Sequence, residues 1–406
     1  MNSPAETPHA GTLRLLLGGD HVGDLMLNAE DRTEFRLSRD YLALYPRPVL
    51  GQLFEDDLNA IQRSRMQLPA YFSNLLPEAR IRELIAAQIG VSPSREAHLL
   101  AYLGEDLPGD IRAVVDGALP QPSSSETLPN EAGLAHPIKF SIAGVQPKLS
   151  MFRTPDGLTF PATGRGGNLL VKMPGSRYAG VPENEFLTMS WARGSGIVVP
   201  DFWLEPVSEL RNVPPELRES TGQVYVVERF DRPAPGKRIH IEDFAQVLDL
   251  YPSHEGKYKR TNYETVGAIL LQLDVESFYE FLRRLVFVVL SANADAHVKN
   301  WSLWYPDRVR ARLSPAYDLV STIEFIEQDE LALNLAGSKA WDKVGMASFE
   351  SLSKRAGADA VRSKLVVRES IERVRSAWSS LESSASDVLK SRLSKHWARV
   401  PLAAGR

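Results

Sequence analysis

The sequence predicts an α+β fold in which a β-rich half precedes a helical half, with a small α/β unit in front of both. Apolar runs typical of strands concentrate between residues 138 and 233, whereas apolar residues recur at helical spacing over much of residues 234–406. Residues 118–137 are rich in Pro, Ser and Glu, a composition typical of a linker. We therefore expect a first domain at residues 1–117, the linker, and then the two halves.

The composition is that of a globular protein, with 43% hydrophobic and 24% charged residues among 406. The chain contains no cysteine, which excludes disulfides, thiolate zinc sites and cysteine nucleophiles. Its first ten residues lack the basic and apolar regions of a secretory signal, and no apolar run approaches the ~18 residues of a membrane helix. We expect a cytoplasmic protein without membrane contact.

The net charge of −4 argues against binding of nucleic acid by the chain as a whole. Residues 351–406, however, contain 12 Lys and Arg residues against 5 Asp and Glu residues. This basic end is compatible with an approach to nucleic acid or to an acidic partner, and equally with a solvated helix face.

The first domain begins with strand-like runs at residues 12–17 and 22–28, and residues 35–42 form a third such run. Residues 76–90 and 92–104 have helical spacing, and Ser92 is a candidate N-cap of the second helix. Nothing in this domain indicates catalysis.

The next motif is a strand–loop–strand candidate at residues 139–152, with Ala143, Gly144 and Pro147 in the loop. One Gly does not match G-x-G-x-x-G, yet backbone N–H groups of such a loop can lie over phosphates, with Lys148 adding charge. An ordinary hairpin is the alternative.

Lys172 lies within an apolar strand-like run, residues 168–174, where a lysine is costly to bury unless it is paired. The lysine that contacts ATP phosphates in protein kinases occupies such a strand. Glu185, on a predicted helix from Glu183 to Arg193, is a candidate partner. The alternative is an edge strand with Lys172 in water.

A strongly β-prone run at residues 223–233 ends in charged residues. In a two-lobed kinase the lobes join at this place and adenine rests against the chain, although a plain core strand explains the run equally well. Helical spacing then dominates residues 241–251, 263–273 and 276–292.

Four polar residues, Asp295, His297, Lys299 and Asn300, are crowded between apolar segments within Ser291–Trp304. Asp295 and Asn300 keep the spacing of the kinase motif H-R-D-x-x-x-x-N. Asp318 follows a predicted strand, Val309–Leu313, and would be the second acidic residue. This pattern predicts phosphoryl transfer, with Asp295 orienting the acceptor hydroxyl and Asn300 and Asp318 holding Mg²⁺. A turn capped by its own Asn and Asp residues is the alternative.

The chain contains, in this order, FSIAGVQPKLS, LLVKMP, ENEF, VERFDR, EDFAQVL, NADAHVKNWSL and LSPAYDLVS. Together these motifs resemble the HipA family of serine/threonine kinase toxins. NLLPEARIRELIA and LLAYLGEDLPGDIRAV are similar to the N-terminal subdomain of that family. The resemblance covers essentially the whole chain.

The resemblance implies a bilobal protein-kinase-like fold, dependence on ATP and Mg²⁺, and a role for Asp295 as the catalytic aspartate. It implies that Asn300 and Asp318 bind the metal, and that Ser141 is autophosphorylated, which ejects the loop and switches the kinase off. The ATP-binding residues that it implies are Ala143, Gly144, Val145, Gln146, Pro147, Lys148, Lys172, Glu228, Arg229, Phe230, His297, Val298, Lys299, Asn300, Tyr317 and Asp318.

Two positions depart from the family pattern. Ala296 stands where the family motif T-D-G-H-x-K-N has Gly, which limits backbone freedom. Pro147 stands where Glu is frequent, which removes an N–H group from the loop.

The resemblance also implies partners. The expected substrate is an aminoacyl-tRNA synthetase, above all glutamyl-tRNA synthetase, whose phosphorylation halts translation and produces dormancy. The expected antitoxin is a HipB-like helix-turn-helix protein, and the complex would bind operator DNA. Two other hypotheses are a pseudokinase that acts as a DNA-bound corepressor and a small-molecule kinase of the aminoglycoside type.

Overall fold

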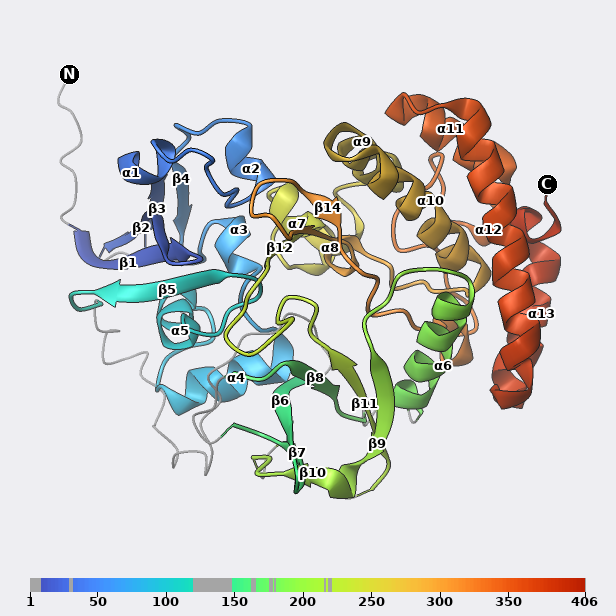
Figure 1. The fold of residues 1–406 in the computed structure, drawn as a ribbon, viewed down its shortest axis with the longest axis horizontal. Coiled ribbons are helices and arrows are strands. Elements are labelled where there is room, and N and C mark those ends of the chain that lie inside the picture. The colour runs from blue at the N-terminus through green and yellow to red at the C-terminus, as the bar shows by residue number, and fades with distance from the viewer. Residues whose placement is uncertain are drawn as a thin grey trace.

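The computed structural model describes residues 9–28, 32–119, 148–161, 166–174, 178, 180–214, 217 and 221–405. Strands dominate the chain up to residue 228 and helices dominate after it, so the predicted α+β class and the order of its two halves are confirmed (Figure 1). None of the helices in these described ranges is both long and apolar enough to cross a membrane.

The N-terminal unit, residues 9–119, contains an antiparallel sheet of five strands in the order β4-β3-β2-β1-β5. Its elements are β1 (His9–Leu17), β2 (Asp20–Asn28), β3 (Arg32–Leu37), α1 (Arg39–Leu42), α2 (Gln52–Glu55), β4 (Gln62–Arg65), α3 (Ala70–Ser73), α4 (Ala79–Gln88), α5 (Glu96–Leu103) and β5 (Ile111–Asp116).

Two local predictions in this unit differ from the structure. The predicted strand at residues 35–42 ends at Leu37, because the Ser38 side chain accepts a hydrogen bond from the Tyr41 amide and starts α1 there. Helix α5 begins at Glu96 after Arg95, and no side chain caps it. The hydroxyl of Ser92 instead contacts the hydroxyl of Ser94, 2.9 Å away.

The second sheet has six strands in the order β10-β7-β6-β8-β11-β9. Its elements, with the helix between β8 and β9, are β6 (Lys148–Thr154), β7 (Gly157–Thr159), β8 (Leu169–Lys172), α6 (Val181–Gly194), β9 (Phe202–Pro206), β10 (Leu210–Arg211) and β11 (Gln223–Glu228). Since β8 lies between β6 and β11, the edge-strand alternative for Lys172 is wrong.

The helical half contains a three-stranded sheet in addition to its helices. Its elements are β12 (His240–Asp243), α7 (Phe244–Val247), α8 (His254–Tyr258), α9 (Tyr263–Leu273), α10 (Val275–Leu290), the 3-10 helix η3 (Val298–Asn300), β13 (Ser302–Tyr305), β14 (Arg312–Leu313), α11 (Met346–Ala356), α12 (Ala360–Leu381) and α13 (Asp387–Arg399).

Two predictions in this half are also corrected. The predicted helix at residues 241–251 starts as strand β12, because Asp243 and Gln246 form a capping box that delays the helix to Phe244. The predicted strand at residues 309–313 is reduced to Arg312–Leu313, which pairs with Leu303 and Trp304.

The buried residues form two hydrophobic cores that meet at β11. Val224 and Val226 pack into a core shared by the N-terminal unit and the second sheet, whereas Tyr225 and Val227 pack into the core of the helical half. This division follows from the alternation of side chains along a strand. Strand β11 is therefore the boundary from which the chain enters the helical half.

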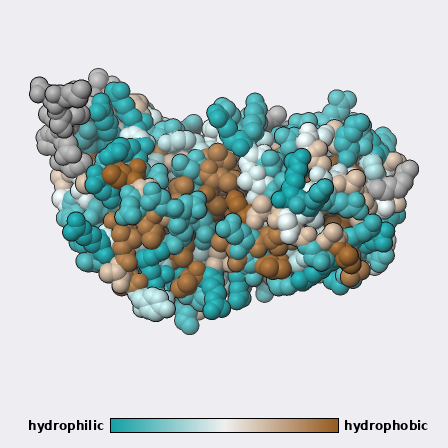
Figure 2. Space-filling model, turned by 90° about the horizontal axis from the view of Figure 1, so that it is seen from above, coloured by the Kyte–Doolittle hydropathy of each residue, from teal (hydrophilic) through white to brown (hydrophobic). Residues whose placement is uncertain are grey.

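Helix α6 lies between β8 and β9 of the second sheet in sequence but packs with the C-terminal helices. Trp191 is buried, donates a hydrogen bond of 2.7 Å to the carbonyl of Val374 and lies 4.7 Å from the ring of Trp378. On the face seen in Figure 2 most of the surface is hydrophilic, and the hydrophobic residues lie in patches among hydrophilic ones.

Candidate active site

A cavity of about 1150 Å³ is lined by residues of the N-terminal unit, the second sheet and the helical half. Most of the residues predicted from the sequence line it: Lys148, Lys172, Glu228, Arg229, Phe230, Asp295, His297, Lys299, Asn300, Tyr317 and Asp318. Val298 does not line the cavity and is fully buried in the core of the helical half. Residues 141 and 143–147, which include Ser141 and the predicted phosphate loop, lie outside the described residues.

One side of the cavity carries two lysines on neighbouring strands. In the register of the sheet Lys148 lies opposite Lys172, and Lys172 lies opposite Tyr225. Like charges in such a cross-strand pair repel each other. The repulsion is compensated by Asp318, which lies 3.0 Å from Lys148 and also forms an ion pair with Lys172.

Lys172 forms a second ion pair with Glu185 of α6, as the sequence predicted. Burial by itself would lower the pKa of Lys172, but the carboxylates of Asp318 and Glu185 outweigh burial and raise it. Burial likewise favours a higher pKa of Asp318, but Lys148 and Lys172 hold that pKa well below its usual range. Lys172 is therefore charged and the Asp318 carboxylate is ionised at neutral pH.

The backbone of Asp318 has a φ angle of 56°, in the left-handed region that residues with a Cβ rarely adopt. Such a conformation costs about 1–3 kcal/mol and is frequent at functional sites. Here it coincides with the placement of the Asp318 carboxylate between two lysines of the second sheet.

The Asp295 loop, residues 291–300, follows α10 and contributes Ala294, Asp295, His297, Lys299 and Asn300 to the cavity wall. The Asn293 side chain accepts a hydrogen bond of 3.0 Å from the amide of Asp295, and the Asn300 side chain donates one of 2.7 Å to the carbonyl of Asp295. These contacts are those of a capped turn. The Asp295 carboxylate, however, accepts a hydrogen bond from the hydroxyl of Tyr258 and not from the loop.

The residues fit the expected magnesium ion. In Asn300 the amide nitrogen is the hydrogen-bond donor, so its oxygen remains suited to a metal, and Asp318 supplies a carboxylate. Mg²⁺ prefers such oxygen ligands and keeps water and substrate phosphates as its other ligands. The part of the chain that the structure describes contains no group of three or more acidic or His side chains that could hold a metal ion.

The end of the cavity near β11 is apolar and fits a planar base. Leu170 and Val227 lie opposite each other in the register of β8 and β11, and both line the cavity. The ring of Phe230 lies 5.9 Å from that of Tyr317 at an interplanar angle of 33°. The polar groups of the site thus come from two strands, helix α6 and two loops. The apolar side chains lie beside the chain segment that links the two halves.

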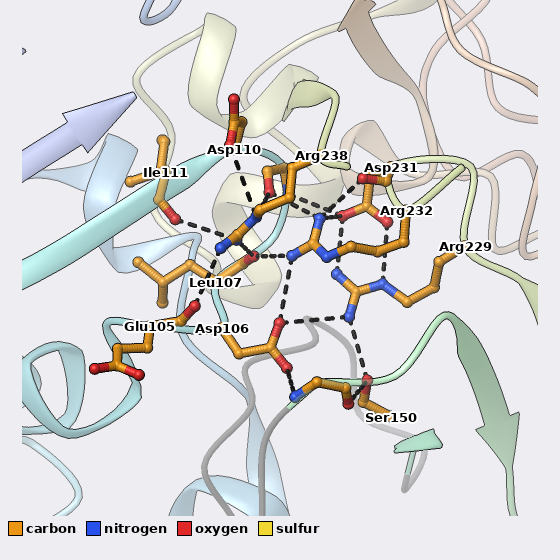
Figure 3. Close-up of polar contacts among 12 residues, drawn as sticks. Glu105, Asp106, Leu107, Asp110, Ile111, Ser150, Arg229, Asp231, Arg232 and Arg238 are labelled. Atoms are coloured by element: carbon orange, nitrogen blue, oxygen red, sulfur yellow. Dashed lines mark hydrogen bonds and ion pairs between the residues drawn. The ribbon is translucent and has the colours of Figure 1, made fainter. Parts of the chain in front are cut away.

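That linking segment, residues 228–232, is fixed by buried ion pairs (Figure 3). Asp231 accepts hydrogen bonds of 2.8 Å from Arg229, 2.7 Å from Arg232 and 3.0 Å from the amide of Gly109. Arg229 also donates to the hydroxyl of Ser150, 3.3 Å away. The predicted contact residue Arg229 is therefore occupied by protein groups, although it lines the cavity.

The N-terminal unit supplies the other half of this network. Arg238 donates to the carbonyl oxygens of Glu105, Leu107, Gly109 and Ile111 at 2.7–3.3 Å (Figure 3). Burial lowers the pKa of Arg238 to about 10, which leaves the guanidinium charged at neutral pH. Carbonyl groups of residues 105–111 therefore surround the guanidinium group of Arg238, which follows the linking segment in sequence.

Sequence reasoning missed several residues of the cavity wall. Asn74, Glu78 and Arg80 come from the N-terminal unit, and Lys257 and Tyr258 come from α8. A signal was present, because Asn74 and Glu78 bracket the apolar Leu-Leu-Pro stretch in the same way that polar residues interrupt the apolar run near Asp295.

Comparison with known proteins identifies the family. Residues 13–114 match the model of the HipA N-terminal domain, and residues 140–378 match that of the HipA-like C-terminal domain, which is more than half of the chain. The chain belongs to the HipA family. The resemblance inferred from the seven motifs is thereby confirmed.

Members of the HipA family with related sequences include proteins named as kinases. The chain is 40% identical to the putative kinase Y4dM of Sinorhizobium fredii over 383 residues. This alignment covers 91% of this chain and 92% of that protein. It is 28% identical over 338 residues to the serine/threonine-protein kinase toxin HipA of Shewanella oneidensis, covering 74% and 73% of the two chains.

A solved structure shares the fold. HipA of Shewanella oneidensis MR-1, determined in a complex with HipB and operator DNA, matches with a TM-score of 0.71 and 21% identity over 97% of this chain and 96% of that chain. This similarity confirms the predicted kinase-like α+β fold.

Proposed function

We propose that this HipA-family protein is a serine/threonine protein kinase that transfers the γ-phosphate of ATP in the presence of Mg²⁺. The observation that carries the proposal is that the ion-paired set of Lys172, Glu185 and Asp318 lines the same cavity as Asp295 and Asn300. A strand lysine paired with a helix glutamate, a loop Asp five residues before an Asn, and a second Asp are the recurring parts of protein kinases.

Each side chain has a role in this proposal. Lys148 and Lys172 bind the phosphates of ATP, and the apolar end of the cavity, with the backbone of residues 228–230, binds adenine. Asn300 and Asp318 hold Mg²⁺, which neutralises charge on the transferred phosphoryl group when it is bound. Asp295 orients the acceptor hydroxyl and accepts its proton.

We further propose that the chain is the toxin of a toxin–antitoxin module. Its relative from Shewanella oneidensis is named a kinase toxin and has been solved with HipB and operator DNA, which supports a HipB-like antitoxin and DNA as partners. An aminoacyl-tRNA synthetase as substrate, and autophosphorylation at Ser141 as the means of inactivation, rest on the family resemblance.

Intact-mass spectrometry of the purified protein, with and without Mg·ATP, tests the kinase proposal. The wild-type protein should gain the mass of one phosphate, mapped to Ser141 by peptide analysis, and Asp295→Asn should bind ATP but gain nothing. A wild-type protein that binds ATP and phosphorylates neither itself nor a synthetase would contradict the proposal. That result would favour the corepressor hypothesis.

A further inference from the structure

Two chain segments position Asp295, the proposed base, and each contains a buried lysine. The first is the Asp295 loop itself, which contains Lys299 next to Asn300. The second is α8, in which Lys257 precedes Tyr258, the residue whose hydroxyl binds the Asp295 carboxylate. Lys257 is 5% exposed and Lys299 is 6% exposed.

Both lysines point to the N-terminal unit. The Nζ atom of Lys299 lies 2.7 Å from Oδ1 of Asn74, 3.4 Å from the Asn74 carbonyl oxygen, 3.2 Å from the Asp243 carboxylate and 3.7 Å from that of Glu78. An ammonium group has three N–H donors. At least three acceptors of the protein surround Lys299, so its N–H donors are occupied by protein groups. Lys148 and Lys172 contact Asp318 instead.

Glu78 joins the two segments. Its Oε2 atom forms an ion pair with Lys257, and its Oε1 atom faces Lys299. Burial favours a higher pKa of Glu78, but the charges of Lys299 and Lys257 outweigh it and lower the pKa, so the carboxylate is ionised. One carboxylate of the N-terminal unit thus faces a cation from each segment that touches Asp295.

Asn74 is itself held in place on both sides. Its side-chain amide donates hydrogen bonds of 2.9 Å to the carbonyl of Ala70 and 2.7 Å to the carbonyl of Leu250, in the chain between α7 and α8. The acceptor offered to Lys299 therefore has a defined orientation. Buried charges that are paired and hydrogen-bonded in this way restrict the conformations of the segments that carry them.

We infer that Asn74 and Glu78 are positioning residues, through which the N-terminal unit holds the Asp295 loop and α8 in their working geometry. The effect on catalysis rests on the proposed kinase function, whereas the effect on the loop does not. In this inference Lys299 is an anchor of the loop rather than a ligand of the nucleotide.

The test compares Glu78→Gln with Asp20→Asn, a matched control. Asp20 also forms an ion pair across the boundary of the N-terminal unit, with Arg308 at 2.5 Å. The side chains of Asp20 and Arg308 are both well exposed, however, and neither lines the cavity. Both variants replace a carboxylate by an amide of the same shape. The difference between them is therefore the position at which the negative charge is removed.

The first readout is hydrogen exchange of peptides that cover residues 291–301, where the amides of His297 and Asn300 are hydrogen-bonded within the loop. Glu78→Gln should accelerate exchange of these amides by at least about tenfold, because the variant loses the charge through which Glu78 holds both segments. Asp20→Asn should leave them unchanged. Asn74→Ala provides the same comparison if Glu78→Gln does not fold.

The second readout is the kinetics of phosphoryl transfer. Glu78→Gln should lower kcat by about tenfold and leave KM for ATP unchanged, because the lysines at Asp318 are untouched. A loss of fold would instead lower the active fraction and the thermal midpoint together. Wild-type exchange of the loop in both Glu78→Gln and Asn74→Ala would overturn the inference, even in an active kinase. If the wild-type protein transfers no phosphate, the exchange result still decides the inference, and the kinase proposal alone fails.

Discussion

The hydroxyl group of Tyr258 donates a hydrogen bond to Oδ1 of Asp295. Burial and the charge of Asp295 raise the pKa of Tyr258 above its usual value, so the hydroxyl keeps its proton and remains the donor. The ring of His297 lies 5.0 Å from the ring of Tyr258, at an interplanar angle of 79°. One oxygen of the proposed base is therefore occupied, and an acceptor hydroxyl must use the other.

Tyr258→Phe removes this hydrogen bond and leaves the ring contact with His297. We expect kcat for phosphoryl transfer to fall by roughly tenfold, which corresponds to about 1.4 kcal/mol, because the carboxylate loses one of the groups that orient it. KM for ATP should not change. Steady-state kinetics decide the matter, and an unchanged or higher kcat would mean that the Tyr258 hydroxyl competes with the acceptor instead of orienting the base.

Lys172 and Glu185 should contribute unequally to stability. Lys172→Met leaves the fully buried carboxylate of Glu185 without its cation, which costs about 3–5 kcal/mol. Glu185→Gln leaves Lys172 paired with Asp318 and should cost less. Urea unfolding of both variants measures the difference, and an equal loss in the two would show that Glu185 is not dependent on Lys172.

Glu242 predicts a pH dependence of stability. It belongs to β12 and is buried where this strand meets the N-terminal unit, and it accepts a hydrogen bond of 3.0 Å from the Gln52 amide and one from the Tyr305 hydroxyl. Burial raises the pKa of Glu242 from 4.5 to about 8. Between these values the unfolded chain releases a proton that the folded chain keeps, so rising pH destabilises the fold.

This contribution should decrease the free energy of unfolding by up to about 1.4 kcal/mol for each pH unit between 4.5 and 8. Glu242→Gln cannot titrate, so its stability relative to the wild type should improve steadily across that window. Chemical denaturation at several pH values provides the comparison. Parallel curves for the two proteins would mean that Glu242 is ionised in the folded state.

The arginine network around the linking segment should be essential for stability. Arg229 and Arg232 share the carboxylates of Asp231 and, at longer distances, Asp106. Asp231→Asn removes the nearer of the two charges from these buried arginines, and we expect a loss of about 3–5 kcal/mol. The control is Glu350→Gln, which breaks an exposed ion pair with Lys364 and should cost less than about 1 kcal/mol. Thermal or denaturant unfolding measures both, and similar small losses would contradict the proposed role of the network.

Much of the site was predictable because its pattern is local. Asp295 and Asn300 lie five residues apart on one loop, and the strand that carries Lys172 is recognisable by its apolar neighbours. The pairing of Lys172 with Glu185 was also predicted, from the order of a strand and a helix. The predictions that failed concern short elements, such as β12, where capping by Asp243 replaced the expected helix start.

The sequence by itself determined the family, the order of the β-rich and helical halves and the residues of the proposed phosphoryl-transfer site, because motif spacing and hydrophobic periodicity are properties of neighbouring residues. Only the tertiary structure decided that Asn74 and Glu78 reach Lys299 and Lys257, since these contacts join segments 225 and 179 residues apart. Such contacts depend on how the N-terminal unit packs against the helical half, and no local pattern encodes that arrangement.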